Sequence, residues 1–374
     1  MVGKAEAVAT AIDIDHNQLR ALVRLYYRAK KALFVWGGTG IGKSQSVKQA
    51  AMEMAKELNL TYTDDVSHIN DEKYFVVVDL RLSQMDPSDL RGIPVFNKDA
   101  QATVWLPPDY FPRKGHGILF FDELNLAPPL VQASAYQLIL DRRLGTYQAP
   151  EGFSLVAAGN RLEDRASVFE MAAPLKNRFG HCQLREPTVE LWSEWAIKHD
   201  MDFRIIGFLN FRRTALYQFD PRIKENAFPT PRSWEHVSAL IKEFESSQLG
   251  LIQQVVATQV GIGIAGEFAT FIRVKDKLHE MKYYLDDPDG CTLPDENTSP
   301  DLIWALITSF AEHYKAHTDV DTLKKIIKVL RRVNEEYAVF TLKLMVTVDR
   351  ALTQKIIKIP EASKLARKLI DFFE

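Results

Sequence analysis

Short, nearly continuous apolar runs alternate with amphipathic stretches through the first half of the chain. Apolar runs of four to eight residues bounded by turn residues are typical of strands that are covered on both faces of a sheet. Five such strands are predicted, at residues 33–36, 74–80, 117–121, 153–158 and, as a shorter one, 181–184. Apolar residues at helical spacing predict helices at 15–30, 44–58 and 131–140. This alternation over residues 32–185 indicates an α/β fold with a five-stranded, mainly parallel sheet and helices on both faces.

Other segments of the first half lack these patterns. Residues 61–73 are polar and are predicted to form a loop. Residues 81–115 contain five prolines and only short apolar pieces, which indicates a hairpin or an inserted loop. Residues 144–152 have turn chemistry between two strand-like pieces.

The character of the chain changes at Glu186-Pro187. From there to about residue 280 the segments are helical in pattern, residues 285–300 are acidic and rich in turn residues, and residues 301–374 predict three or four more helices. We therefore expect an α/β domain at 1–185, a helical domain at 186–284 and a helical C-terminal extension at 285–374.

Composition indicates the class of the protein and its expected compartment. Hydrophobic residues make up 46% and charged residues 26% of the chain, as in ordinary soluble globular proteins. The formal net charge of −2 gives no overall tendency to bind polyanions. Two cysteines indicate thiols in a reducing compartment, not a disulfide framework or a metal cluster. Without an 18-residue apolar run or the apolar core of a signal peptide, the sequence predicts a cytoplasmic protein with no membrane insertion.

The segment between the first predicted strand and the following helix has the sequence GGTGIGKS at residues 37–44, which fits the phosphate-binding pattern G-x-x-x-x-G-K-[ST]. Glycines let successive backbone N–H groups converge on an anion, and the helix adds the positive end of its dipole. Lys43 would reach the β- and γ-phosphates, and the Ser44 hydroxyl would bind Mg²⁺. The residues expected to hold the nucleotide are Gly37, Gly38, Thr39, Gly40, Ile41, Gly42, Lys43, Ser44 and Gln45.

Two further strand ends carry polar side chains that suit nucleotide hydrolysis. Asp122, directly after the strand at 117–121, is the expected metal-side carboxylate, and Glu123 is the expected base that polarises water. Asn160, at the tip of the next strand, can orient water without adding charge. Ligands of parallel α/β sheets bind at the carboxyl ends of the strands, so these groups and the phosphate loop should lie at one edge.

Together, the phosphate loop, ILFFDE at 118–123, Gly-Asn at 159–160 and LKNRF at 175–179 resemble the AAA+ ATPases. Within that family the chain is most similar to the MoxR branch, which is related to the dynein and midasin modules, although its loop lacks the Pro and the final Thr common in that branch. The similarity covers roughly residues 30–240. It implies a P-loop αβα sandwich, an all-helical lid, a helical extension, and ATP with Mg²⁺ bound in the cleft between core and lid.

The resemblance also assigns loops. The DLRG sequence at 89–92 matches a loop of the insert that the branch carries in its second helix, here at about 81–115. Residues 144–152 fall where the branch has a hairpin before its first sensor, which corresponds to Asn160.

It further assigns arginines. Arg178 matches the arginine finger that reaches the γ-phosphate of a neighbouring subunit, with Arg142, Arg143 and Arg165 as rivals. Arg232 matches the second sensor at the start of a lid helix.

The implied function is ATP hydrolysis by a homo-oligomer, typically a hexameric ring, that acts as a chaperone: it remodels or activates a protein client, often with a partner that carries a von Willebrand factor A domain. Two alternatives share the same core, a nucleic-acid motor or helicase loader and a nucleotide-gated assembly switch with weak hydrolysis.

Lysines and arginines between 324 and 332 form either a solvated helix face or a surface for an anionic partner. Apolar residues at 93–105 either pack on their own domain or face a ring axis or a partner.

Overall fold

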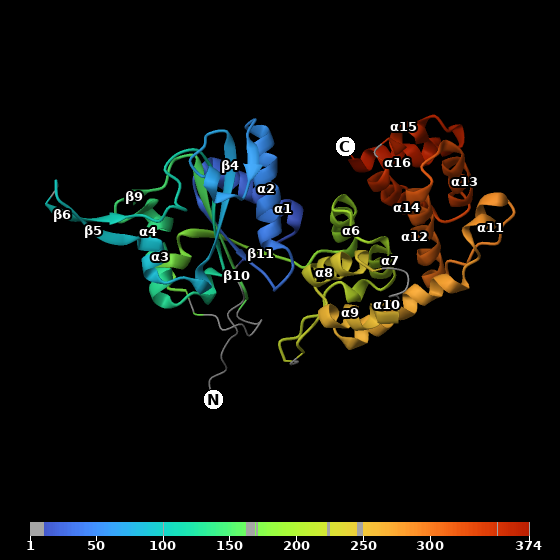
Figure 1. Ribbon diagram of the computed structural model, residues 1–374, viewed down its shortest axis with the longest axis horizontal. Helices are drawn as coiled ribbons and strands as arrows, with labels where there is room; N and C mark the ends of the chain where they lie inside the picture. Colours follow the sequence, from blue (N-terminus) through green and yellow to red (C-terminus); the bar gives the residue numbers. More distant parts are fainter. Residues whose placement is uncertain are drawn as a thin grey trace. The chain divides into compact units, whose positions relative to one another are not determined.

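The computed structural model describes residues 11–99, 101–161, 169, 171–222, 225–244, 250–349 and 351–373. The chain divides into two compact units (Figure 1). Unit 1 comprises Met1–Pro187 with Asp220–Arg222, and unit 2 comprises Thr188–Phe219 with Ile223–Glu374.

Unit 1 is built on a seven-stranded sheet in which every pairing is parallel, in the order β1-β11-β2-β10-β7-β4-β3. Its central strands consist almost entirely of buried residues, as the continuous apolar runs predict. The strands are β1 (Ile12–Ile14), β2 (Ala32–Trp36), β3 (Thr61–Thr63), β4 (Tyr74–Arg81), β7 (His116–Asp122), β10 (Phe153–Gly159) and β11 (Phe179–Leu184).

The number of strands corrects the sequence prediction of five. The five predicted strands are confirmed as β2, β4, β7, β10 and β11, whereas β1 was not predicted and the loop predicted at 61–73 is wrong where β3 forms. Both additional strands are three residues long, lie at the two edges of the sheet and are partly exposed. An edge strand this short carries no continuous apolar run, so hydrophobic patterning cannot detect it.

Helices cover both faces of this sheet (Figure 1). Helices α1 (His16–Ala29) and α2 (Lys43–Glu57) pack on each other and on one face. On the other face, α4 (Pro129–Asp141) places Val131 and Leu138 in a buried cluster with Leu119 and Phe121 of β7. The arrangement confirms the predicted P-loop αβα sandwich. Two short helices, α3 (Pro87–Arg91) and α5 (Ala173–Lys176), contribute Leu90 and Leu175 to the same buried cluster as α4.

Two small antiparallel hairpins extend from unit 1, β5 (Ile93–Asn97) with β6 (Ala102–Leu106), and β8 (Arg143–Leu144) with β9 (Tyr147–Gln148). They contact each other, because the Thr146 hydroxyl donates a hydrogen bond to the Trp105 carbonyl oxygen (2.6 Å). Apolar side chains of the first hairpin remain exposed, with Ile93 67% and Phe96 59% accessible. In this chain by itself they are not packed on their own domain.

In its described residues, unit 2 contains helices joined by loops and no strand. Its helices are α6 (Val189–Lys198), α7 (Phe203–Phe211), α8 (Pro231–Lys242), α9 (Ile252–Val260), α10 (Ile262–Val274), α11 (Met281–Asp286), α12 (Pro300–Ala316), α13 (Val320–Leu330), α14 (Glu335–Val348), α15 (Leu352–Ile357) and α16 (Ser363–Phe373). From residue 300 on, the described residues form five α-helices instead of the three or four predicted. The excess arises because α15 is only six residues long and begins soon after α14 ends.

One cluster of buried residues forms the core of unit 2. Trp234 is fully buried in this cluster, and its ring centroid lies 5.6 Å from that of Phe208 and 5.7 Å from that of Phe268. Its indole N–H donates to the Ala215 carbonyl oxygen (2.8 Å). The cluster runs from Val189 to Leu369 without a break at residue 285. The division of this region into a lid and an extension stays a prediction.

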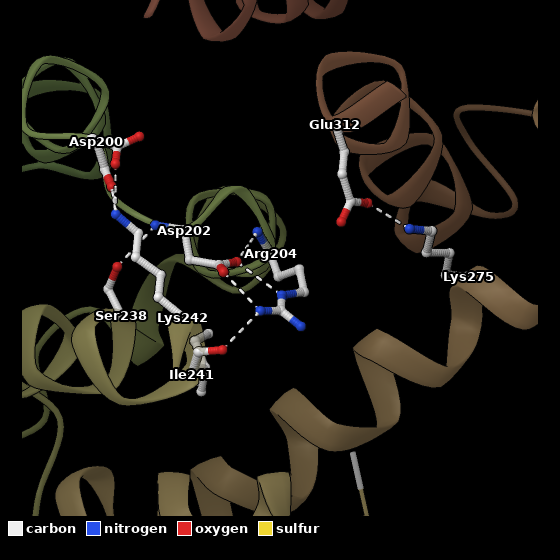
Figure 2. Close-up of polar contacts among 8 residues, drawn as sticks. All are labelled: Asp200, Asp202, Arg204, Ser238, Ile241, Lys242, Lys275 and Glu312. Atoms are coloured by element: carbon white, nitrogen blue, oxygen red, sulfur yellow. Dashed lines mark hydrogen bonds and ion pairs between the residues drawn. The ribbon is translucent and has the colours of Figure 1, made fainter. Parts of the chain in front are cut away.

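Polar contacts connect the helices around this core (Figure 2). The Arg204 guanidinium binds both carboxylate oxygens of Asp202, the N-cap of α7, at 2.9 and 2.7 Å. Lys242 of α8 pairs with Asp200 (2.8 Å), and Lys275 pairs with Glu312 of α12 (2.5 Å). The two lysine pairs join elements that are far apart in sequence but share one core.

The described helices are too short or too polar for any of them to cross a membrane.

Both cysteines, Cys182 and Cys291, are free and buried. Burial raises the pKa of the Cys182 thiol to about 12, so this thiol is protonated and unreactive at neutral pH.

Gly117 tests the packing of the sheet, because a Cβ at this position would lie 2.0 Å from the Val76 carbonyl oxygen and 2.5 Å from the Phe153 ring. We expect Gly117→Ala to lower the free energy of unfolding by about 1–3 kcal/mol through overpacking, measured by urea denaturation. Gly263→Ala in α10 is the matched control, since no atom lies within 4 Å of its added Cβ. Equal unfolding of both variants would contradict the close approach of β4 and β7.

Candidate functional site

The phosphate loop connects β2 to α2 and depends on its glycines. Gly40 and Gly42 have φ of 73° and 97°, in the left-handed region that side chains disfavour. A Cβ on Gly37 would lie 2.7 Å from Cδ1 of Ile41. Gly42 is also the N-cap of α2 and provides no side-chain acceptor for the first N–H groups of the helix. An anion is the natural acceptor for such groups.

Lys43 begins α2, and its ammonium group folds back over the loop. Nζ donates hydrogen bonds to the carbonyl oxygens of Gly37 (2.8 Å) and Gly38 (2.9 Å) and to Oδ1 of Asn160 (3.0 Å). The structure therefore brings together two of the predicted residues, Lys43 at the start of α2 and Asn160 after β10. A phosphate oxygen would replace neutral acceptors by a charged one, which forms the stronger bond with an ammonium group.

Ser44 and Asp122 meet at the same edge. The Ser44 hydroxyl donates to Oδ2 of Asp122 (2.9 Å), and Oδ1 of Asp122 accepts from the Glu123 backbone N–H (2.9 Å). A hydroxyl and a carboxylate are hard oxygen ligands, and Mg²⁺ in nucleotide sites uses one or two carboxylates with phosphate oxygens and water. The Ser44 hydroxyl and the Asp122 carboxylate are therefore suitable ligands for Mg²⁺. Within the described ranges no group of three or more His, Cys, Asp or Glu side chains could hold a metal without such help.

Glu123 has a left-handed backbone (φ 56°), which is unusual for a residue other than glycine. Its Oε2 accepts a hydrogen bond from the hydroxyl of Ser83, which lies just after β4. Sequence reasoning missed Ser83, because it is distant in sequence and belongs to no motif. This contact orients the carboxylate of Glu123, the predicted base.

Asn125 is a second residue that sequence reasoning missed. Its side chain is buried (2% exposed), donates to the Asn160 carbonyl oxygen (2.7 Å) and accepts from the Asn160 backbone N–H (3.2 Å). A Cβ on Gly159 would lie 2.3 Å from Oδ1 of Asn125, so glycine is required there for this contact. Asn125 thereby fixes the backbone that presents Asn160. Its place two residues after Glu123 is the only signal in the sequence.

A further carboxylate lies beside this edge. Loss of hydration and, after it, the negative charge of Asp122 raise the pKa of Asp79 on β4. Lys48 and Arg81 oppose the shift. A cation bound at Asp122 would offset the repulsion between the two carboxylates.

The arginines predicted as possible arginine fingers differ in the hydrogen bonds that their guanidinium groups form. The Arg142 guanidinium donates to the carbonyl oxygens of Pro150 (2.7 Å) and Phe153 (2.6 Å), and burial lowers its pKa. Arg142 therefore binds the segment between the β8–β9 hairpin and the start of β10. Arg143 donates to the side chain of Gln148 in that hairpin (3.3 Å), while Arg165 lies outside the described residues.

Arg178 follows α5, is exposed and, in the described part of the chain, forms no ion pair. The segment that carries it is tied to the strand before the phosphate loop. The His181 ring accepts a hydrogen bond from the Trp36 indole N–H (3.0 Å) and donates from Nε2 to the Lys176 carbonyl oxygen (2.7 Å). The backbone at Arg178 is thus fixed, and its side chain is open to solvent.

Arg232 lies in unit 2, as the second residue of α8. Its side chain is exposed, and the helix start is capped by Thr230, which accepts from the Ser233 N–H (3.0 Å). Its role as the second sensor stays a prediction.

Three of the five basic residues between 324 and 332 form contacts within unit 2. Lys325 pairs with Asp321 (3.3 Å) and Lys328 with Asp289 (3.6 Å). Arg332 donates to the backbone carbonyl oxygens at Pro288 (2.8 Å) and Cys291 (2.6 Å). Exposed ion pairs of this kind are weak, so the choice between a solvated helix face and a surface for an anionic partner stays a prediction.

Comparison with known proteins identifies no family for the chain. No family model matches the sequence, and no match is found among curated proteins. Among solved structures, a mutant of RuvB from Thermotoga maritima is 17% identical over 73% of this chain and 75% of that chain, with a TM-score of 0.34. NtrX from Brucella abortus is 15% identical over 100% and 69% of the two chains (TM-score 0.33), and PCH-2 of C. elegans is 12% identical over 71% and 67% (TM-score 0.28). Similarity this low leaves the function to be argued from the site itself.

Asn125 provides a test of the site's architecture. Asn125→Ala removes a buried donor and acceptor and leaves the Asn160 backbone groups without these partners, so we expect the free energy of unfolding to fall by about 1–3 kcal/mol in urea denaturation. Asn17→Ala is the matched control, because the Asn17 side chain accepts a surface hydrogen bond from Arg20 (2.7 Å), whose loss should cost less than about 0.5 kcal/mol. Unchanged stability of Asn125→Ala would refute its role as a support.

Proposed function

We propose that this chain is an AAA+ ATPase of the MoxR branch, which binds ATP with Mg²⁺ and hydrolyses it to remodel or activate a protein partner. The convergence of Lys43, Ser44, Asp122 and Asn160 carries the proposal. These side chains come from three separate elements and meet through hydrogen bonds of 2.9 Å (Ser44 to Asp122) and 3.0 Å (Lys43 to Asn160). Phosphoryl transfer needs mainly positioning and charge stabilisation, and these groups supply both.

In the proposed reaction the residues have distinct roles. Backbone N–H groups from Gly37 to Gln45, including those of Thr39 and Ile41, surround the phosphates, and Lys43 binds the β- and γ-phosphate oxygens. Ser44 and Asp122 hold Mg²⁺, which neutralises charge on the phosphates when bound. Glu123 accepts the proton of the attacking water while Asn160 orients that water.

The contact with Ser83 leaves Glu123 able to act as a base. Its Oε2 accepts a hydrogen bond from the Ser83 hydroxyl, but a carboxylate has two acceptor oxygens. In the proposal, Glu123 can therefore accept a proton from water while Ser83 orients the carboxylate.

The exposed side chain of Arg178 leads us to include the assembly of several subunits in the proposal. A guanidinium at the γ-phosphate offsets the charge of the transition state and is worth roughly 10³–10⁵ in rate in related NTPases. We propose that Arg178 serves the site of a neighbouring subunit in a ring, typically hexameric, and that Arg232 acts as second sensor from a helical lid at 186–284, with 285–374 as an extension.

The exposed apolar residues of the β5–β6 hairpin favour a protein client over nucleic acid. Ile93, Phe96 and Trp105 present apolar surface, whereas the basic residues of α13 are mostly paired within unit 2. We propose that this hairpin faces a protein partner, for which a protein with a von Willebrand factor A domain is the expected class, in the cytoplasm.

The nucleotide site is tested by two substitutions. Lys43→Ala should abolish ATP binding, whereas Glu123→Gln should bind ATP as the wild type does but hydrolyse it about 10²–10⁴-fold more slowly. Binding is measured by isothermal titration calorimetry and turnover by phosphate release, with Mg²⁺ present. Glu72→Gln, which replaces an exposed carboxylate that pairs with Lys114 (3.7 Å), is the control and should retain full activity. If the wild type binds no purine nucleoside triphosphate, the proposal fails.

The supply of Arg178 in trans is tested by mixing. Arg178→Ala alone should bind ATP but turn over about 10³-fold more slowly. Mixed with Glu123→Gln, it should regain activity, because its intact Glu123 can then be paired with Arg178 of the other subunit. Arg143→Ala is the control and should not need rescue. Near wild-type turnover of Arg178→Ala by itself would remove Arg178 from the site.

A further inference from the structure

His181 on β11 forms two hydrogen bonds that connect the strand before the phosphate loop with the segment before Arg178. Its Nδ1 lies 3.0 Å from Nε1 of Trp36, the last residue of β2. Its Nε2 lies 2.7 Å from the carbonyl oxygen of Lys176, the last residue of α5. Both nitrogens of one ring are therefore engaged, and the ring bridges β2 and α5.

The two partners determine the tautomer of the ring independently, and they agree. The Trp36 indole N–H can only donate, so Nδ1 of His181 is an acceptor without a proton. The Lys176 carbonyl oxygen can only accept, so Nε2 carries the proton and donates it. The bridge therefore uses the neutral imidazole in a single tautomer.

Aromatic side chains hold the His181 ring in place. Its centroid lies 6.0 Å from that of Trp36, with the ring planes 24° apart, and 5.7 Å and 6.2 Å from those of Phe34 and Phe179. Phe34 and Phe179 are both buried, and the parallel pairing of β11 with β2 places His181 beside Phe34. Close packing of this kind restricts the directions in which Nε2 can point.

The segment that receives the Nε2 hydrogen bond is a single helical turn. Helix α5 spans only Ala173–Lys176, which is too short to be stable by itself in water. Leu175 anchors it in the buried cluster, and His181 satisfies the Lys176 carbonyl, one of the groups that a helix end leaves without an intrahelical partner. Arg178 follows two residues later, and its N–H donates to the Leu175 carbonyl oxygen (3.1 Å). The placement of the Arg178 backbone therefore depends on both anchors.

We propose that His181 is a positioning residue for Arg178. Its Nε2 fixes the turn that carries Arg178, so that the guanidinium reaches the γ-phosphate at the site of the neighbouring subunit. This inference rests on the proposed function and adds to it the residue that places the arginine. Because the same ring binds Trp36, next to Gly37, it joins a subunit's own phosphate loop to the arginine that this subunit offers to its neighbour.

Two variants separate the ring nitrogens. In His181→Asn the amide oxygen can take the place of Nδ1 and accept from Trp36, but no donor reaches Lys176. In His181→Gln the amide N–H can take the place of Nε2 and donate to Lys176, but nothing accepts from Trp36. A contribution of the aromatic ring to packing alone is lost in both variants.

We expect His181→Asn to bind ATP like the wild type, measured by isothermal titration calorimetry with Mg²⁺, but to release phosphate about ten- to hundredfold more slowly, because a misplaced catalytic group costs up to about this factor. His181→Gln should retain most of the wild-type turnover. His199→Asn is the control and should keep full activity, since His199 stacks on Trp195 in unit 2. If His181→Asn turns over as fast as His181→Gln or faster, the inference is overturned.

Combination with Arg178→Ala tests whether His181 acts through Arg178. The double variant His181→Asn/Arg178→Ala should hydrolyse ATP as slowly as Arg178→Ala alone, because no arginine is left to position. Mixed with Glu123→Gln, His181→Asn should regain activity, because its intact Glu123 then meets a correctly placed Arg178 of the other subunit. A further loss in the double variant, or no recovery on mixing, overturns the inference.

The remaining outcomes separate this inference from the proposed function. If the wild type does not hydrolyse ATP, the proposed function fails and the inference fails with it. If Arg178→Ala turns over like the wild type, the arginine is not in the site, so the inference fails while ATP hydrolysis stands. If Arg178→Ala is slow but His181→Asn is not, the inference alone fails. If His181→Asn no longer binds ATP, the ring supports the phosphate loop of its own subunit, and the inference is overturned.

Discussion

The hydrogen bond between Ser44 and Asp122 depends on one constraint, the parallel pairing of β2, β10 and β7. Parallel strands end at the same edge, so the loop after β2, the carboxylate after β7 and the amide after β10 are brought to one place. The apolar interiors of these strands make this pairing stable, since helices cover the sheet on both faces. The polar groups at the edge therefore owe their geometry to the buried residues behind them.

The groups at this edge are satisfied within the protein before any ligand arrives. Lys43 binds loop carbonyls, Asp122 accepts from Ser44, and Glu123 is held by Ser83. A nucleotide and its cation would compete with the loop carbonyls for Lys43 and with Ser44 for Asp122, and the new contacts would be charged and therefore stronger.

The two units place their polar groups differently. Unit 1 places the polar groups of the candidate site at one edge of a sheet and carries ion pairs between α1 and α2 as well, whereas unit 2 distributes ion pairs such as those of Asp202 and Lys275 around a continuous apolar core. The edge of the sheet in unit 1 is the arrangement that suits a ligand. Unit 1 also has exposed apolar side chains on the β5–β6 hairpin, which remain accessible to solvent in the folded chain.

The sequence by itself determined the phosphate loop, the five central strands and the carboxylates at their ends, because a buried strand needs a continuous apolar run and the loop needs its glycines. It did not determine β1 and β3, since three-residue edge strands carry no such pattern. The contacts of Ser83 and Asn125 were decided only by the tertiary structure. Each side chain forms a hydrogen bond to a residue from another element, and such a contact exists only once separate strands and helices have packed together.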